Sequence, residues 1–124
     1  MSPETQAVER PTPEFVKVGT VDEVPEGEMK GWVVNAVKVG IAQVEGEFFA
    51  FHDCCTHQQY TLTDSFLMGH RLTCDWHGAS FDLRTGEVKA LPATRDLPMF
   101  PVEVRDGELW VAVPHPDAIE MPPE

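Results

Sequence analysis

The chain has few cysteines and few basic residues. Its three cysteines cannot all pair in a disulfide framework, and an odd number of cysteines near histidines favours metal binding. Nine Lys and Arg against 21 Asp and Glu give a formal net charge of −12. This charge argues against nucleic acids and anionic membranes as partners. The same acidity suits solubility as well as it suits the steering of a protein partner.

Long apolar runs are also absent. No stretch approaches the roughly 20 apolar residues that a membrane-spanning helix needs. The first residues, Met1 to Gln6, have neither the basic nor the apolar region of a signal peptide. We therefore expect a soluble, cytoplasmic protein. With 124 residues, 42% of them hydrophobic, the chain is long enough for one small domain with a modest core.

No segment repeats its apolar residues with the 3.6-residue period of a helix, so we expect no long helix. Short apolar runs separated by turn residues predict strands instead. The expected strands are 15–18, a β-branched stretch from 32–34 on to 40, the hairpin of 41–44 and 47–51 around Glu45-Gly46, and the hairpin of 102–104 and 109–111 around Asp106-Gly107. This pattern predicts an all-β antiparallel sandwich or barrel.

Proline is frequent at both ends of the chain. Residues 1–13 contain three prolines and little apolar content, and residues 114–124 contain four prolines. Both segments have the composition of disordered chain. The predicted organisation is therefore a disordered arm over 1–13, one folded domain over 14–113 and a Pro-rich tail over 114–124.

Two short segments each contain one thiol and one imidazole. Cys55-Thr56-His57 is followed, after sixteen residues, by Cys74-Asp75-Trp76-His77. Two cysteines and two histidines can hold a [2Fe–2S] cluster in which histidine replaces cysteine on one iron. The same set can bind tetrahedral zinc, but zinc ligands are usually paired two to four residues apart. One residue between Cys55 and His57 is short for zinc, so the spacing favours the iron–sulfur centre.

The pattern continues beyond the second histidine with Gly78-Ala79-Ser80-Phe81-Asp82 and then Thr85-Gly86. Together with the ligand spacing, it resembles the Rieske family, and in particular the small ferredoxins of bacterial aromatic-ring-hydroxylating dioxygenases. The resemblance covers roughly residues 14–113, as one domain. It implies a Rieske-type antiparallel β-sandwich or barrel with a small cluster-binding subdomain of two loops, supported by strands 71–73 and 80–82.

The resemblance also implies the ligands. Cys55 and Cys74 would bind the buried iron as thiolates, and His57 and His77 would bind the outer iron. Cys54 stands at the same distance from His57 as Cys74 from His77, so spacing alone leaves Cys54 and Cys55 open. The family pattern favours Cys55, and Cys54 then fills space as a small buried side chain. The remaining histidines are His52, His70 and His115, which have no ligand-spaced partner.

Residues next to the ligands have expected roles as well. Gly78 suits a turn whose backbone comes close to the cluster, with N–H groups left to point at sulfur. Trp76, Phe81 and Pro92 are expected to pack over the two loops. High-potential Rieske proteins have a Ser and a Tyr that donate hydrogen bonds to cluster sulfur. Ala79 and Phe81 stand at those positions here, which implies a low reduction potential.

The resemblance implies a one-electron carrier with one [2Fe–2S] cluster and no catalytic residue. In such systems a NAD(P)H-dependent flavoprotein reductase reduces the ferredoxin, which then reduces the Rieske centre of a terminal oxygenase. We expect a monomer that docks through the uncharged rim around the histidines, including Gln58 and Tyr60. One alternative is the Rieske-like small subunit of a nitrite reductase, although such subunits generally lack the ligand cysteines. A structural zinc module and a redox sensor are the others.

Overall fold

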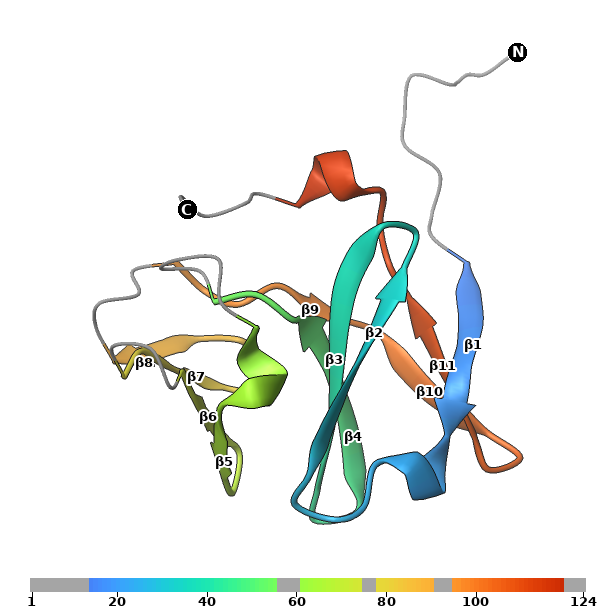
Figure 1. Ribbon diagram of the computed structural model, residues 1–124, viewed down its shortest axis with the longest axis horizontal. Coiled ribbons are helices and arrows are strands. Elements are labelled where there is room, and N and C mark those ends of the chain that lie inside the picture. Colours follow the sequence, from blue (N-terminus) through green and yellow to red (C-terminus); the bar gives the residue numbers. More distant parts are fainter. Residues whose placement is uncertain (1–13, 56–60, 75–77, 91–94, 120–124) are drawn as a thin grey trace.

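In this computed structural model, residues 14–55, 61–74, 78–90 and 95–119 are described, and they form antiparallel β-sheet with three short 3-10 turns (Figure 1). The turns are Val21–Glu23, Leu62–Asp64 and Pro116–Ala118. The strands are β1 (Phe15–Thr20), β2 (Met29–Val34), β3 (Val37–Val44), β4 (Glu47–His52), β5 (Phe66–Met68), β6 (Arg71–Thr73), β7 (Ser80–Asp82), β8 (Val88–Ala90), β9 (Met99–Phe100), β10 (Val102–Arg105) and β11 (Glu108–Ala112). None of the helical turns in this described part is long or apolar enough to cross a membrane.

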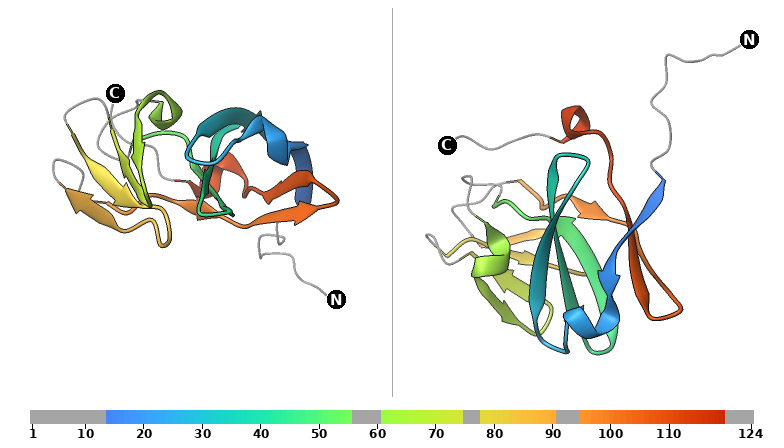
Figure 2. Two further views of the ribbon diagram at one scale, coloured as in Figure 1. Left: turned by 90° about the horizontal axis from the view of Figure 1, so that it is seen from below. Right: turned by 45° about the vertical axis from the view of Figure 1, so that its right-hand side comes forward.

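The strands make three sheets. The first sheet has the strand order β1-β11-β10 and the second β2-β3-β4-β9, and these two sheets form a sandwich. The third sheet, β5-β6-β7-β8, lies beside the second one (Figure 2). The predicted all-β antiparallel fold is therefore confirmed. The third sheet is the predicted cluster-binding subdomain, and it is larger than expected, because β5 and β8 flank the two predicted strands β6 and β7.

In three hairpins the two residues of the turn both have positive φ, the backbone conformation that type I′ turns require. Two of them, Glu45-Gly46 between β3 and β4 and Asp106-Gly107 between β10 and β11, confirm the predicted hairpins. The third, Asn35-Ala36, separates β2 from β3. The β-branched stretch expected to run through this point is therefore two strands, and the prediction of one continuous stretch was wrong.

The β3–β4 hairpin is buried on both faces. Ile41 and Ala50 stand opposite each other and join the core between the two sandwich sheets. Their neighbours Ala42 and Phe51 point the other way and join a second core under the third sheet. Side chains alternate between the faces of a strand, so an uninterrupted apolar run is what a strand between two cores requires. The hairpin thereby connects the subdomain rigidly to the sandwich.

The C-terminal segment is more ordered than its proline content suggests. After the 3-10 turn Pro116–Ala118, Ile119 is buried and packs with Val113 in the sandwich core. The expected disordered tail is thus wrong for residues 116–119. Burial of one large aliphatic side chain favours this arrangement, and the fixed φ of Pro116 reduces the conformational entropy that is lost.

Gly86, part of the Thr85-Gly86 motif, closes the turn between β7 and β8 at a place with no room for a side chain. Its φ is +83°, and its carbonyl accepts a hydrogen bond of 2.7 Å from the N–H of Leu97. A Cβ atom at Gly86 would lie well inside contact distance of the Leu97 carbonyl oxygen. This contact attaches the segment after residue 95 to the subdomain.

We predict that Gly86→Ala destabilises the protein more than Gly107→Ala does. Both positions have positive φ, but a Cβ at Gly107 meets no atom within 4 Å. Gly107→Ala should therefore cost only the left-handed backbone penalty of about 1 kcal/mol. Gly86→Ala should cost about 1–3 kcal/mol more, because the backbone must move. Denaturant unfolding of both variants checks this; equal losses would contradict the steric account.

Candidate iron–sulfur centre

The subdomain core contains two thiols from different hairpins. Cys55 follows β4, Cys74 follows β6, and each is only 1% exposed. Both belong to the same cluster of buried residues as Leu72 and Phe81. Two thiols in one apolar core are a donor set that suits a [2Fe–2S] cluster, and none of the three cysteines, all of which are described, forms a disulfide.

Cys54 is buried but lies outside that cluster of residues. Its Sγ is 3.8 Å from the carbonyl oxygen of Cys55. Adjacent residues at the end of a strand point in different directions. Cys55 shares the apolar core with Cys74, and the choice of Cys55 over Cys54 as the ligand stays a prediction.

The proposed histidine ligands lie outside the described residues. This holds for His57 and His77, and also for Gln58, Tyr60, Trp76 and Pro92, so the predictions about them stay predictions. Within the described ranges, no group of three or more His, Cys, Asp or Glu side chains could hold a metal ion. Cys55 and Cys74 are the two proposed ligands that those ranges contain.

A buried carboxylate closes the base of the first ligand loop. Asp53, which is 2% exposed, accepts hydrogen bonds from the N–H of Thr63 at 2.8 Å and from its Oγ1 at 2.7 Å. A Cβ at Gly31 would lie 2.8 Å from Asp53 Oδ2, so a glycine is needed opposite this contact. On the outside of the loop, the Lys38 ammonium donates to the Thr61 hydroxyl. The segment that begins with Cys54 and Cys55 is therefore held at both of its ends.

Backbone hydrogen bonds close the second ligand loop. The N–H of Cys74 donates to the Ala79 carbonyl at 2.6 Å, and the N–H of Gly78 donates to the Cys74 carbonyl at 3.2 Å. Gly78 has a φ of +81°, which explains why glycine occupies the position. The Gly78 N–H is thus occupied by the Cys74 carbonyl, and the expectation that other N–H groups of this turn point at sulfur stays a prediction.

The segment that was expected to cover the loops is fixed where it returns to the sheet. Asp96 Oδ1 accepts a 3.0 Å hydrogen bond from the N–H of Val88 in β8. Leu97 is buried among the same core residues as the two thiols. Residues 91–94, which include Pro92, lie outside the described part, but both of their flanks are connected to the subdomain.

The surroundings of the thiols are apolar. Ala79 and Phe81 are fully buried in the same core, so Phe81 packs beside the loops as predicted. Neither side chain has a hydroxyl that could donate to sulfur. Ser80 between them is buried too, but its Oγ accepts a 3.0 Å hydrogen bond from Arg71 Nε on the outer face of the sheet.

His52 and His70 each pack against an aromatic ring. His52, at the end of β4, is buried beside the Phe100 ring, and burial lowers its pKa below the usual value. It is therefore uncharged at neutral pH. His70 packs edge-on against Phe49, with ring centroids 5.6 Å apart. Neither contact suggests a metal ligand, and sequence spacing had excluded both.

Sequence analysis missed the Asp53–Thr63 contact. A signal was present, because an acidic residue directly precedes two cysteines at the end of an apolar strand. An aspartate in such a place is buried only when hydrogen bonds compensate it. The identity of its partner, however, depends on where the chain returns after the loop, and the sequence does not show this.

Comparison with known proteins agrees with the geometry. The family model described as "Rieske [2Fe-2S] domain" matches residues 14–101. The chain is 39% identical over 98 residues to the biphenyl dioxygenase ferredoxin subunit of Pseudomonas sp. (strain KKS102), covering 78% of this chain and 90% of that protein. It is 33% identical over 95 residues to the ferredoxin component of the naphthalene 1,2-dioxygenase/salicylate 5-hydroxylase systems of Ralstonia sp., covering 77% and 91%.

A solved structure is similar as well. A chain in the complex of reduced oxygenase and oxidized ferredoxin in carbazole 1,9a-dioxygenase superposes with a TM-score of 0.75 at 32% identity, covering 79% of this chain and 92% of that one. The fold and the two buried thiols define an iron–sulfur electron-transfer protein. The chain belongs to the Rieske [2Fe-2S] domain family. It carries one [2Fe–2S] cluster and acts as an electron carrier, not as a catalyst.

We predict that the Asp53–Thr63 contact holds the cluster in place. Thr63→Val keeps the shape of the side chain but removes the hydroxyl that bonds Asp53, a loss of about 1–3 kcal/mol for a buried hydrogen bond to a charged group. Loss of visible absorbance in the presence of an iron chelator should become faster. Thr85→Val is the control, since it removes an exposed hydroxyl that accepts from the Glu87 N–H. Equal decay rates in the two variants would show that the contact does not support the loop.

Proposed function

We propose that this protein transfers single electrons from a NAD(P)H-dependent flavoprotein reductase to the Rieske centre of a terminal aromatic-ring-hydroxylating oxygenase. The observation that carries the proposal is the pair of buried thiols, Cys55 and Cys74, which come from separate hairpins into one apolar core. Relatives named as ferredoxin components of such systems, at 33% and 39% identity, supply the reaction partners.

In the proposed site, Cys55 and Cys74 bind one iron of the cluster, and His57 and His77 bind the other. The cluster supplies one-electron chemistry when it is bound. The chain supplies an apolar core around the thiols and two loops closed at their bases. Contacts that hold the residues next to metal ligands orient those ligands and limit the access of water. The family description names an iron–sulfur domain, so the zinc alternative finds no support.

The number of electrons determines which partners are needed. NAD(P)H gives up two electrons together as a hydride, whereas the cluster takes one. A flavin can accept the pair and release the electrons one at a time, which is why the donor is a flavoprotein. The carrier works as a monomer in the cytoplasm, where NAD(P)H is available. A small, short-lived contact of less than about 1,200 Å² suits this shuttling role.

Reconstitution tests the proposed function and its ligands together. With NADH, a reductase and an oxygenase of a biphenyl- or naphthalene-type system, product formation should require this protein. Cys54→Ser should retain the coloured cluster and most of the activity, because it removes only a packing thiol. Cys55→Ser should lose the cluster, and its folding should weaken, because metal-binding energy contributes to the stability of such a subdomain. A bleached Cys54→Ser with a coloured Cys55→Ser would shift the ligand by one residue.

The reduction potential should lie near the negative end of the range for Rieske centres, about −150 to +300 mV. Hydrogen bonds to sulfur stabilise the electron-rich reduced state. Ala79 and Phe81 are buried beside the thiols without a hydroxyl, so this stabilisation is missing. A potentiometric titration measures the midpoint, and Ala79→Ser should raise it. A clearly positive midpoint in the wild-type protein, or no rise in the variant, would contradict this explanation.

A further inference from the structure

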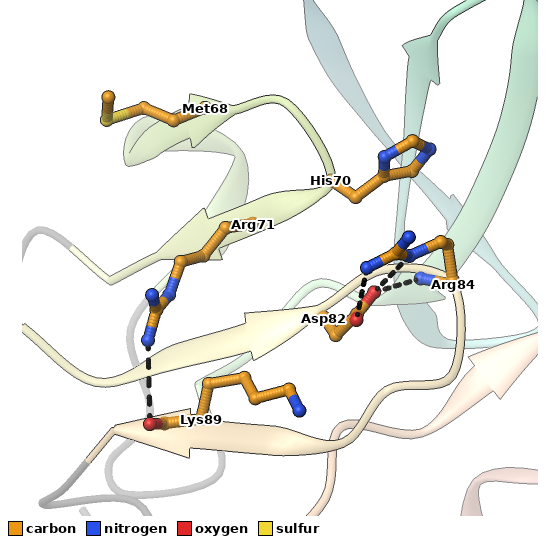
Figure 3. A pocket seen from close by; sticks show the side chains of 6 residues that line it. All are labelled: Met68, His70, Arg71, Asp82, Arg84 and Lys89. Atoms are coloured by element: carbon orange, nitrogen blue, oxygen red, sulfur yellow. Dashed lines mark hydrogen bonds and ion pairs between the residues drawn. The ribbon is translucent and has the colours of Figure 1, made fainter.

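The outer face of the third sheet holds a hollow of about 270 Å³, on the side away from the subdomain core. Three of the nine basic residues of this acidic chain lie around it. Figure 3 shows their side chains extending over the sheet surface. The residues that line the hollow are Met68, His70, Arg71, Asp82, Arg84 and Lys89.

One basic residue is already neutralised. Asp82 accepts from Arg84 through both carboxylate oxygens, with Nε–Oδ1 and Nη2–Oδ2 distances of 3.1 and 2.9 Å. These hydrogen bonds lower the pKa of Asp82 to about 2. Asp82 therefore stays ionised at neutral pH. The Asp82–Arg84 pair forms one wall of the hollow and contributes no net charge (Figure 3).

Arg71 is held in place without a carboxylate. Its Nε donates to Ser80 Oγ at 3.0 Å and its Nη2 to the Lys89 carbonyl at 3.5 Å, so the guanidinium lies across β7 toward β8 (Figure 3). No ion pair of Arg71 occurs among the described residues. Lys89 contacts Glu87 at 3.1 Å, a pair that is exposed to solvent on both sides. Three basic side chains therefore line the hollow with only one carboxylate, Asp82, while Glu87 lies beside Lys89 and Glu45 acts on Arg84 from outside the lining.

Exposed apolar side chains border this charge. Phe66 and Met68, on the edge strand β5, are 56% and 75% exposed. They alternate along the strand with Leu67, which packs against the subdomain core, so both point outward. Arginine, methionine and aromatic residues are the side chains most enriched in protein interfaces. The mixture suits a protein surface better than it suits a small free anion.

The strands that form the outer face of this sheet are also close to the ligand loops in the sequence. β6 leads directly into Cys74, and β7 begins two residues after Gly78. We propose that the outer face of the β5-β6-β7-β8 sheet, formed by Phe66, Met68, Arg71 and Lys89, is a second docking surface that binds a carboxylate-bearing patch of the terminal oxygenase. The surface rests on the proposed function. The oxygenase is chosen because a similar chain is solved in complex with one.

The surface complements the contact at the histidine tip. The rest of the chain is strongly acidic, so a local positive face orients an acidic partner patch toward one side of the subdomain. Salt limits the range of exposed charges to about 8 Å at physiological ionic strength. The face therefore acts on the final orientation of the complex and on its rate of formation.

The test is a stopped-flow comparison with the loaded protein. In Arg71→Glu/Lys89→Glu, the second-order rate of electron transfer to the oxygenase should fall about tenfold at low ionic strength. The rate should approach that of the wild type in about 0.5 M salt, where exposed charges are strongly screened. Reduction by the flavoprotein reductase should stay within about twofold of the wild-type rate, because that partner docks at the tip alone.

The matched control is Lys30→Glu/Arg105→Glu, which makes the same charge change on β2 and β10, where each residue has an exposed carboxylate partner. Equal losses in both double variants would overturn the proposal, because they would show an effect of net charge. A wild-type rate with the oxygenase, or a loss confined to the reductase, would overturn it too. Should Arg71→Glu alter the spectrum, Arg71→Gln/Lys89→Gln must show a smaller loss in the same direction.

A further variant separates the apolar part from the charge. Met68→Gln should slow transfer to the oxygenase at every salt concentration, because screening does not affect apolar contacts; an unchanged rate would remove β5 from the surface. Failure of the proposed function can be distinguished from failure of this surface. If the proposed function is wrong, the wild-type protein itself will not reduce the oxygenase.

Discussion

Burial of the β3–β4 hairpin on both faces is the constraint on which the rest of the molecule depends. Ile41 and Ala50 face the sandwich core, while Ala42 and Phe51 face the subdomain core. A shift of one residue in the pairing would exchange these sets and place a large ring where an alanine fits. The register is therefore strongly determined. Because Cys55 follows three residues after the end of β4, the same packing limits where the first thiol lies.

The two ligand loops are held by different chemistry. The first depends on a buried carboxylate, Asp53, and on a threonine that follows the loop. The second depends on backbone groups of Cys74, Gly78 and Ala79. In both cases the contact joins residues that flank the loop, so each loop is closed at its base. Such support allows a carrier to change its charge with little movement of its fold.

The sequence predicted those parts of the fold that depend on local chemistry. Glu45-Gly46 and Asp106-Gly107 place glycine where positive φ is required, and both hairpins were found. Asn35-Ala36 adopts the same conformation without glycine, between β-branched residues, and it was missed. Strands β5 and β8 have only three residues each, and they form because β6 and β7 offer edges to pair with. Such pairing is a property of the assembled sheet.

The candidate site divides in the same way. The spacing of cysteines and histidines, together with the segment from Gly78 to Gly86, was enough to identify the family. The partner of Asp53 and the position of Leu97 against Gly86 depend on where the chain returns after a loop. Ile119 was misjudged because composition describes an average over a segment, whereas burial acts on one side chain. The outer face of the β5-β6-β7-β8 sheet brings together residues between 66 and 89 whose charges are scattered along the sequence.

The pairing of β1 with β11, in which Phe15 stands opposite Ala112, brings opposite ends of the domain together. During synthesis on a ribosome, β1 emerges early and waits for a partner that is made almost last. The residues of the subdomain core, from Ala42 to Leu97, are all translated before β11. The strands around the two thiols pair without β1 or β11, and the sandwich closes only when the two ends of the domain meet.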